Sequence, residues 1–307
     1  MLVEVSKEEY RQRFTTNPHM FISEEFIGMV ENKCDRVVRL MKEDDSSMGL
    51  IAGITDGILE SPFSAPFGGF HYSHEYQFYY TISNFLADLK EYIRKEKLNG
   101  FSITLPPDLY QSNMNAKLVN ALIRLGFNLV TPDINNWIDL KNFDGTWPKY
   151  VVEQNCRKAV KHGLVWSVED ERESLEEGYR VILKNREEQN REIHMTLDGL
   201  LDMRSIIPVD FFMVKDNVGK AIATGVFYRG HEKIVQGIFM GDDMEKRNLG
   251  AMNLMYKHCF YHYKEMGFDY IDLGTSSLKG EPNIGLIRFK ELHNCITSLR
   301  YTFAWSP

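Results

Sequence analysis

Four side chains that can take up a proton or carry a charge accompany one short apolar segment near the end of the sequence. The segment at 270–273 is predicted to be a strand, and it holds or is followed by Asp272, Ser276, Lys279 and Glu281. Binding and catalytic groups gather at strand ends where a sheet opens. These residues are therefore candidates for proton transfer. Asp272 alternates with two apolar neighbours, so it faces either a pocket, as a catalytic group, or the surface.

The stretch before that strand predicts a site for an anion. An apolar strand at 234–240 and a helix at 248–266 are joined by a polar turn, and Gly267 ends the helix. Apolar residues recur along the helix at steps of three and four: Leu249, Met252, Met255, Tyr256, Cys259, Phe260 and Tyr263. The first N–H groups of a helix lack partners within it, and the helix dipole favours negative charge there. The loop from Gly241 to Gly250 is thus a candidate phosphate or pyrophosphate site.

This loop resembles the CoA-binding core of the GNAT acyltransferase superfamily. In that family Arg or Gln, two residues, Gly, one residue, and Gly or Ala cradle the pyrophosphate of CoA. The matching positions here are Arg247, Asn248, Leu249, Gly250, Ala251 and, where a small residue is expected, Met252. The resemblance implies that the stretch from Arg247 to Ala251 binds acetyl-CoA or another acyl-CoA.

The same resemblance places the rest of the donor along the preceding strand. It implies that the backbone of Phe239, Met240 and Gly241 lies against the pantetheine arm and the acyl carbonyl. The loop is also preceded by acidic residues that oppose an anionic ligand, namely Asp242, Asp243 and Glu245.

The elements that position these residues occur in a similar order in both halves of the chain. The first half predicts strands at 36–41 and 48–59 joined by the acidic turn 43–47, a helix at 75–97, a strand at 101–105, a helix at 115–125 and strands within 127–140. The second predicts helices at 150–164 and 173–192, strands at 211–215 and 220–229, and then the stretch 233–277. Both halves therefore show paired strands followed by helix, strand and helix.

This duplication resembles the FemAB family, whose members have two tandem GNAT-like domains. The second half of such proteins often opens with a basic helix, as at 155–161 here, and closes with a segment like Gly285–Lys290 and a final strand, here at 299–303. The resemblance implies an α/β fold (a mixed α+β sheet) of two GNAT-like domains, 1–142 and 143–307, with the donor-binding core in the second. It also marks Lys290 as a catalytic candidate that could neutralise a phosphate or carboxylate, or else as a solvated helical lysine.

A second candidate segment is the loop SPFSAPFGGF at 61–70. Its prolines and paired glycines prevent regular structure, while its phenylalanines are too apolar for an idle surface loop. The loop either lines a substrate pocket, with Phe67, Gly68, Gly69 and the following His71 as binding residues, or packs on the core. Ser276 is a further substrate-binding candidate.

Composition narrows the class of protein. The 307 residues suggest two domains, and a net charge of −7 argues against a protein devoted to a nucleic-acid backbone. Neither a membrane span nor a signal peptide is apparent, so a cytoplasmic location is expected. The widely spaced cysteines predict buried free thiols. His258 and His262 have zinc-like spacing but no third ligand, so structural histidines and no metal are expected.

These observations favour an acyltransferase that moves an acyl group from acyl-CoA to the amine of a small molecule or peptide, bound between the two domains. A FemAB-like aminoacyltransferase that uses aminoacyl-tRNA is the alternative, and it predicts a basic surface. A third possibility is a non-catalytic small-molecule binding module of the same fold, because Met252 and the acidic residues before the loop both oppose CoA.

Overall fold

The computed structural model describes residues 1–43, 47–73, 78–193 and 195–307. The chain forms two compact units: unit 1 contains Met1–Asn135, Ser277–Pro282 and Ser298–Pro307, and unit 2 contains Asn136–Ser276 and Asn283–Thr297. The sequence suggests one break between residues 142 and 143, whereas this division falls at Asn135–Asn136 and assigns two C-terminal segments to unit 1. The last strand belongs to unit 1 because it pairs with a strand of that unit, and the segment Ser277–Pro282 belongs there because Ser277 and Gly280 form hydrogen bonds with Asp133; local sequence patterns reveal neither contact.

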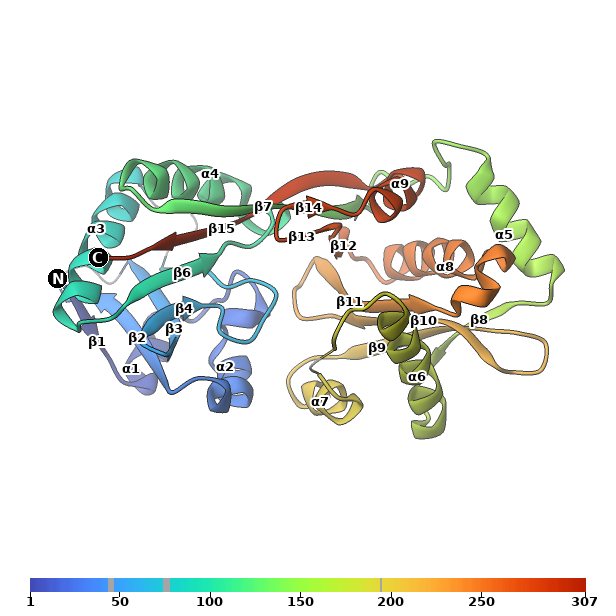
Figure 1. The fold of residues 1–307 in the computed structure, drawn as a ribbon, viewed down its shortest axis with the longest axis horizontal. Coiled ribbons are helices and arrows are strands. Elements are labelled where there is room, and N and C mark those ends of the chain that lie inside the picture. Colours follow the sequence, from blue (N-terminus) through green and yellow to red (C-terminus); the bar gives the residue numbers. More distant parts are fainter. Residues whose placement is uncertain (44–46, 74–77, 194) are drawn as a thin grey trace. The chain divides into compact units, whose positions relative to one another are not determined.

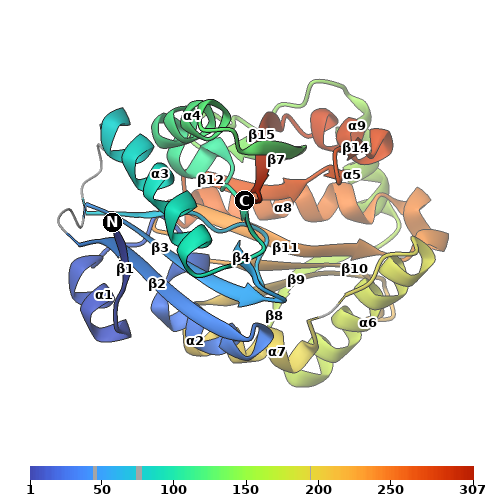
Figure 2. The ribbon, with the colours of Figure 1, turned by 60° about the vertical axis from the view of Figure 1, so that its left-hand side comes forward.

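Unit 1 is a mixed sheet with helices on both faces (Figures 1 and 2). Its strand order is β1-β2-β3-β4-β6-β15, and β5 pairs with β3. The strands are β1 (Leu2–Glu4), β2 (Arg36–Lys42), β3 (Met48–Thr55), β4 (Ile58–Ser61), β5 (His71–Tyr72), β6 (Gly100–Thr104) and the end of β15 (Ile296–Trp305), together with the small hairpin β13 (Ser277–Leu278) and β14 (Glu281–Pro282). The helices are α1 (Lys7–Arg13), α2 (Glu24–Val30), α3 (Tyr79–Lys95) and α4 (Asp108–Arg124).

The helices of unit 1 form where the sequence supplies caps and an apolar face. Ser6 and Ser23 cap α1 and α2, their Oγ atoms accepting hydrogen bonds from backbone N–H groups three residues ahead, both at 3.2 Å. Helix α3 buries a stripe at helical spacing: Ile82, Phe85, Leu86, Leu89 and Ile93. This stripe joins the core that β2, β3 and β6 contribute.

Unit 2 repeats this order of elements. Its strands are β8 (Val165–Glu169), β9 (Val209–Lys215), β10 (Ala221–Tyr228), β11 (Ile234–Asp242) and β12 (Tyr270–Thr275), in the order β12-β11-β10-β9-β8. Its helices are α5 (Val151–Lys161), α6 (Arg172–Glu188), α7 (Leu197–Asp202), α8 (Ala251–Glu265) and α9 (Ile284–Leu292), and β7 (Asn128–Asp139) connects it to unit 1.

Helices α6 and α8 cover opposite faces of the unit 2 sheet (Figure 1). A Cβ added to Gly178 of α6 would meet Thr224 of β10 at 3.0 Å, whereas a Cβ added to Gly225 would meet Met255 of α8 at 3.2 Å. Neighbouring residues of a strand point to opposite faces, so the two helices lie on different sides of β10. The α8 face holds the large aromatic core of unit 2.

The α/β fold with a mixed sheet and a duplicated element order is confirmed, and most predicted elements appear within a few residues of their expected bounds. Three details differ. The run 48–59 is two strands, because Asp56 and Gly57 adopt positive φ and turn the chain. Strand β8 lies between α5 and α6, in a stretch for which no element was expected. The helix expected from residue 248 starts at Ala251, after a 3-10 turn over Met244–Leu249.

Parts of two predicted elements cannot be compared with the structure. Residues 44–46 of the predicted acidic turn and the start of the helix expected from residue 75 lie outside the described residues.

Candidate active site

The central feature of unit 2 is an opening between β11 and β12. The two strands are parallel and pair at three positions, the last joining Gln236 to Asp272. No pairing follows between them among the described residues, although β11 continues to Asp242 and β12 to Thr275. Exposure changes at the same place: β11 is buried up to Gly237 and becomes partly exposed over Ile238, Phe239 and Met240. We call this region, Ile238–Met240 with Gly274 and Thr275, the β11–β12 opening.

A β-bulge marks the start of the opening. Val226 of β10 pairs with Phe239 and Phe227 pairs with Gly237, so Ile238 is an extra residue of β11. Bulges increase local twist and re-aim the strand, and they are common beside binding sites. The bulge therefore explains how β11 leaves β12 while staying paired with β10. Phe239 and Met240, predicted to bind the donor, lie directly after it.

Lys290 is a residue of α9 whose side chain reaches the end of β12 and is 2% exposed. Its Nζ donates hydrogen bonds to the carbonyl oxygens of Leu273, Gly274 and Thr275, at 2.8, 2.9 and 3.4 Å. Burial lowers its pKa to about 8, so the ammonium form dominates at neutral pH. This buried cation, rather than a solvated helical lysine, stands where β12 enters the opening.

Asp272 is fully buried in β12, at 0% exposure. Its Oδ1 accepts a hydrogen bond from the N–H of Gly274 at 2.9 Å, which fixes the backbone just before the carbonyls that Lys290 binds. Its negative charge also opposes the lowering of the Lys290 pKa. The surface position considered for Asp272 is wrong, because the side chain has no solvent exposure.

Ser276 belongs to a buried polar cluster in unit 2. Its Oγ donates to Oδ1 of Asn136 at 2.5 Å, Asn136 in turn donates to Thr297 at 3.0 Å, and the Ser276 carbonyl accepts from Asn283. Lys279 and Glu281 are exposed in and beside the β13–β14 hairpin, which belongs to unit 1.

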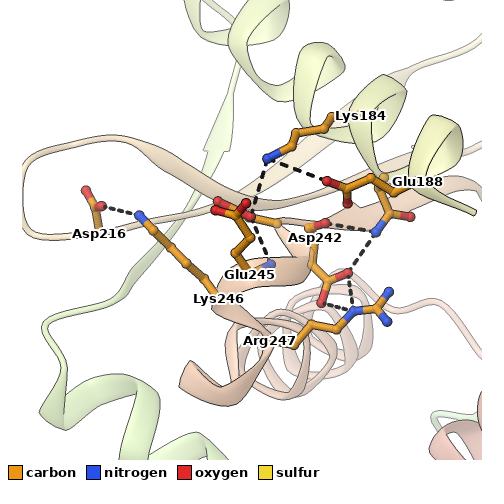
Figure 3. A network of polar contacts seen from close by, with 9 residues as sticks. Lys184, Glu188, Asp216, Asp242, Glu245, Lys246 and Arg247 are labelled. Atoms are coloured by element: carbon orange, nitrogen blue, oxygen red, sulfur yellow. Dashed lines mark hydrogen bonds and ion pairs between the residues drawn. The ribbon is translucent and has the colours of Figure 1, made fainter.

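The predicted pyrophosphate loop carries a network of ion pairs (Figure 3). Nε of Arg247 donates to both carboxylate oxygens of Asp242 at 3.1 Å, and the amide of Asn185 donates to the same residue at 2.8 and 2.9 Å. Lys184 lies 3.9 Å from Asp243, and Lys246 lies 3.3 Å from Asp216. Two of the three acidic residues before the loop, Asp242 and Asp243, thus have a neighbouring cation, whereas Glu245 forms no ion pair among the described residues.

Arg247 itself keeps binding capacity. Its side chain is 49% exposed, and only its Nε is bonded within the described part of the chain. Asp242 therefore holds the guanidinium by one edge and leaves the two terminal nitrogens for a phosphate. Guanidinium nitrogens pair well with phosphate oxygens, so Arg247 can bind an anion through these two atoms.

The turn from the loop into α8 depends on glycine. Gly250 has φ +82°, and an added Cβ would lie 2.5 Å from the carbonyl oxygen of Asn155 in α5. Asn248 and Leu249 end the 3-10 turn, and Ala251 begins α8 with its side chain buried. The N–H groups of the first turn of α8, which lack partners within the helix, therefore follow Gly250 at the end of the loop that carries Arg247.

The candidate loop of unit 1 is packed rather than open. Phe67 and His71 are each 1% exposed, Gly68 donates its N–H to Thr104 at 2.9 Å, and Gly69 donates to Ser61 at 3.2 Å. A small pocket in unit 1 is lined by residues 61–65 at the start of the loop, but by none of the predicted binding residues. This placement favours the packed interpretation of the loop.

The histidines with zinc-like spacing pack against aromatic rings. The ring of His258 stacks on Trp166 at 4.6 Å, and His262 meets Phe212 edge-on at 5.1 Å. No group of three or more possible metal ligands occurs among the described residues. Cys156 and Cys259 are buried free thiols as expected, whereas Cys34 and Cys295 are only partly buried. No described helix has the length and apolarity needed to cross a membrane.

Sequence reasoning missed the β11–β12 opening, because backbone that has lost a pairing partner leaves no signature in residue type. It also missed the carbonyl oxygens of Leu273, Gly274 and Thr275 as ligands of the Lys290 ammonium.

The chain has a tandem GNAT-like fold. Its two units share one order of elements, and in unit 2 a parallel pair of strands separates before the turn into α8. The crystal structure of FemX matches with a TM-score of 0.68 and 12% identity over 100% of this chain and 97% of that chain. The C-terminal domain of a putative lysylphosphatidylglycerol synthetase from Agrobacterium fabrum matches with a TM-score of 0.62 and 15% identity, over 98% and 93%.

A tandem GNAT protein from the clavulanic acid biosynthesis pathway, solved without AcCoA, matches with a TM-score of 0.59 and 10% identity over 100% and 98%. No protein-family model matches the sequence, and no curated protein matches it. At these identities the structural matches show a common fold.

Proposed function

We propose that the protein is an acyltransferase that moves an acyl group from acyl-CoA to an amine, with the donor bound in unit 2. The observation that carries this proposal is the β11–β12 opening. Three partly exposed residues interrupt an otherwise buried strand at the position where its parallel neighbour departs. Backbone N–H and C=O groups without a ladder partner must find another, and the amides of a pantetheine arm supply matching donors and acceptors.

The chemistry requires a polarised acyl carbonyl and a deprotonated amine. We assign the first task to backbone N–H groups of β11 near Phe239 and Met240, which would bind the developing oxyanion. Lys290 supplies a positive charge where β12 enters the opening, in a dry setting that strengthens its field. Asp272 acts through Lys290 by keeping the ammonium protonated and its carbonyl ligands in place. Ser276 is retained as a substrate-binding candidate through its link to Asn136.

Acyl-CoA is the first candidate donor because Arg247, the αL turn at Gly250 and the start of α8 follow the opening in that order. The test is a thermal-shift titration of the full chain with CoA and acetyl-CoA, since a ligand that binds only the folded state raises its apparent stability. A saturable rise that Arg247→Glu abolishes would support the assignment. A rise that is unaffected by Arg247→Glu would remove Arg247 from it, and no rise at millimolar CoA would exclude CoA as donor.

Aminoacyl-tRNA is the second candidate donor, favoured by the exposed basic face of α5. Arg157, Lys158, Lys161 and the adjacent His162 are all exposed on that helix. The name of one structural neighbour, a putative lysylphosphatidylglycerol synthetase, also fits transfer of an aminoacyl group. Complex formation with tRNA should then fall steeply as salt is added. Absence of any complex at low salt would exclude this donor.

A further inference from the structure

Two arginines of unit 2 are half-buried without a carboxylate partner. Among the described residues, the arginines of intermediate exposure are Arg39, Arg186, Arg191, Arg204, Arg229 and Arg300. Four of them form ion pairs, with Glu24, Asp170, Asp210 and Asp133. Within the same described part of the chain, Arg186 and Arg191 form none. Withdrawing a charge from water without a partner is costly, so this pair requires an explanation.

The end of helix α6 brings these two arginines together. Asn190, after the helix, has φ +52°. The N–H of Arg191 donates a hydrogen bond to the carbonyl oxygen of Arg186 at 2.9 Å, and the N–H of Asn190 donates one to the carbonyl oxygen of Glu187, also at 2.9 Å. These are the two hydrogen bonds of a Schellman motif, in which the first and last residues usually make an apolar contact. Here both positions carry a guanidinium, and each charge disfavours the other. The local fold therefore holds two like charges where an apolar pair is usual.

The pair lies close to the candidate active site. Asn185, the residue before Arg186, is hydrogen-bonded to Asp242 at the end of β11. The charge of Arg186 also contributes to lowering the pKa of Lys290. Lys290 is on α9, whose Phe289 packs on Tyr256 of α8 at 5.0 Å, whereas α6 covers the other face of the sheet. An anion on the pair would thus approach the opening from the face opposite α8.

We propose that Arg186 and Arg191 form a binding site for an anionic group, phosphate or carboxylate, of the amine acceptor. The inference rests on the proposed transferase function, in which the donor phosphates are assigned to Arg247 and the start of α8. Two guanidinium groups can bind such an anion through charge-assisted, bidentate hydrogen bonds. The nearby carboxylates of α6 do not compete: Glu187 and Glu188 are exposed, and Glu188 pairs with Lys184 at 3.6 Å.

The first experiment measures anion binding by the full chain without any donor. Isothermal titration with inorganic pyrophosphate and with succinate, carried out in the Arg247→Glu background so that the proposed donor phosphate site does not contribute, distinguishes a phosphate from a carboxylate ligand. At least one of them should bind, and Arg186→Gln and Arg191→Gln should each weaken that binding at least about tenfold. Arg180→Gln is the matched control, because Arg180 is exposed on the same helix, 3.8 Å from Glu176. Binding of neither anion, or an equal loss in the control, would overturn the proposal.

The melting temperature distinguishes an anion-binding role of these arginines from a purely structural one. Arginines near a helix C-terminus can simply complement the helix dipole. In that case Arg186→Gln would lower the melting temperature and leave anion affinity unchanged, which would refute the site. We expect the melting temperature without anion to stay the same or rise, because one of two mutually repelling charges is removed. In the Arg247→Glu background, pyrophosphate or succinate should then stabilise only the protein that keeps both arginines and its Arg180→Gln control.

Anion binding by the two arginines and acyl transfer can be measured separately. A protein that binds the anion through both arginines but neither acyl-CoA nor aminoacyl-tRNA would retain the site and lose the transferase assignment. Conversely, if Arg186→Gln acylates an amine with the same KM for the acceptor as the parent protein, the transferase function is supported and the arginine site is refuted.

Discussion

The second strand of the parallel pair ends differently in the two units. In unit 1, β4 and β6 pair along the whole of β4, and the backbone N–H of Gly68 then binds the carbonyl of Thr104 at 2.9 Å. In unit 2, β11 and β12 separate after three pairs, and the carbonyls at the end of β12 bind the ammonium of Lys290. The same carbonyl positions thus accept hydrogen bonds from main chain in one unit and from a buried cation in the other.

This difference explains why only one unit is a candidate for catalysis. The loop of unit 1 fills the end of its strand pair with its own backbone, and Phe67 and Phe70 are buried beneath it. In unit 2 the residues Ile238–Met240 stay partly exposed. A duplicated fold can therefore keep the same elements while one copy closes the position that the other uses for a ligand.

The largest expected effect follows from removing the cation of unit 2. Lys290→Met should lower kcat/KM for acyl transfer by about 10²–10³-fold, as loss of a group that stabilises developing negative charge does. Lys290→Arg keeps the charge and should retain part of the activity. Steady-state kinetics at neutral pH, with circular dichroism to verify folding, would measure both. A folded Lys290→Met variant of full activity would contradict the role of Lys290.

The pH profile tests the same assignment without relying on folding of a variant. The ammonium form is required and its pKa is about 8, so the rate should fall as pH rises through about 8. Lys290→Arg should lack this fall, because guanidinium stays protonated. An identical falling limb in both proteins would assign it to a group other than Lys290.

A substitution that disrupts the packed loop of unit 1 should lower the free energy of unfolding and leave the catalytic rate unchanged. A Cβ on Gly68 would lie 2.4 Å from Oγ of Ser61 and 2.6 Å from the backbone of Pro62. Gly68→Ala should therefore lower the free energy of unfolding by about 2–3 kcal/mol. Urea unfolding measures this loss, and kcat of the folded variant should stay within about twofold of the parent value.

Two matched substitutions separate this clash from a general effect of glycine replacement. Gly28, in α2 of the same unit, has no atom closer than 3.8 Å to an added Cβ, so Gly28→Ala should not destabilise. At Gly237, beside the opening of unit 2, the nearest atom is the flexible end of Met240 at 3.0 Å, so Gly237→Ala should cost less than about 1 kcal/mol. If both variants lost the same free energy of unfolding, the packed loop of unit 1 and the β11–β12 opening of unit 2 would not differ in the way proposed.

Acid should lower the free energy of unfolding through His71, which follows the packed loop of unit 1. Its Nδ1 lies 2.9 Å from the hydroxyl of Tyr10 and its Nε2 lies 2.9 Å from Oδ1 of Asn17. Burial lowers its pKa from 6.5 to about 3, so below pH 6.5 the unfolded chain binds a proton that the folded chain does not. The free energy of unfolding should fall as pH decreases from 6.5 toward 3, by about 1.4 kcal/mol per pH unit from this group.

Urea midpoints at a series of pH values test this slope. His71→Gln cannot titrate in this range and should flatten the slope by the His71 share. His162→Gln is the control, because His162 is exposed and does not depend on packing. A slope that His71→Gln leaves unchanged would place the acid sensitivity elsewhere, for example at the buried His293 of unit 2, whose pKa burial lowers to about 4.

Element type and order could be predicted from the sequence because they depend on local periodicity, such as the buried stripe of α3 and the left-handed Gly267 at φ +87° after α8. The division of the chain could not, because the pairing of Thr302 with Thr104 joins residues far apart in sequence. At the site, Arg247 and Gly250 carry a recognisable local pattern. The unpaired stretch of β11 depends on tertiary structure and has no residue motif of its own. The local turn after α6 brings Arg186 and Arg191 together, but their lack of a carboxylate partner among the described residues depends on tertiary structure.

The smallest expected effect concerns the loop that only unit 2 presents to the donor. Asp242 holds Nε of Arg247, and its negative charge lies near the proposed pyrophosphate site. In Asp242→Asn the amide oxygen can still accept from Nε while the charge is gone, so CoA should bind about two- to fivefold more tightly. Asp216→Asn makes the same charge change beside Lys246, and should alter affinity less (Figure 3). Weaker CoA binding by Asp242→Asn would mean that the ionised carboxylate is needed to orient Arg247, because orientation would then outweigh the repulsion between the carboxylate and the phosphates.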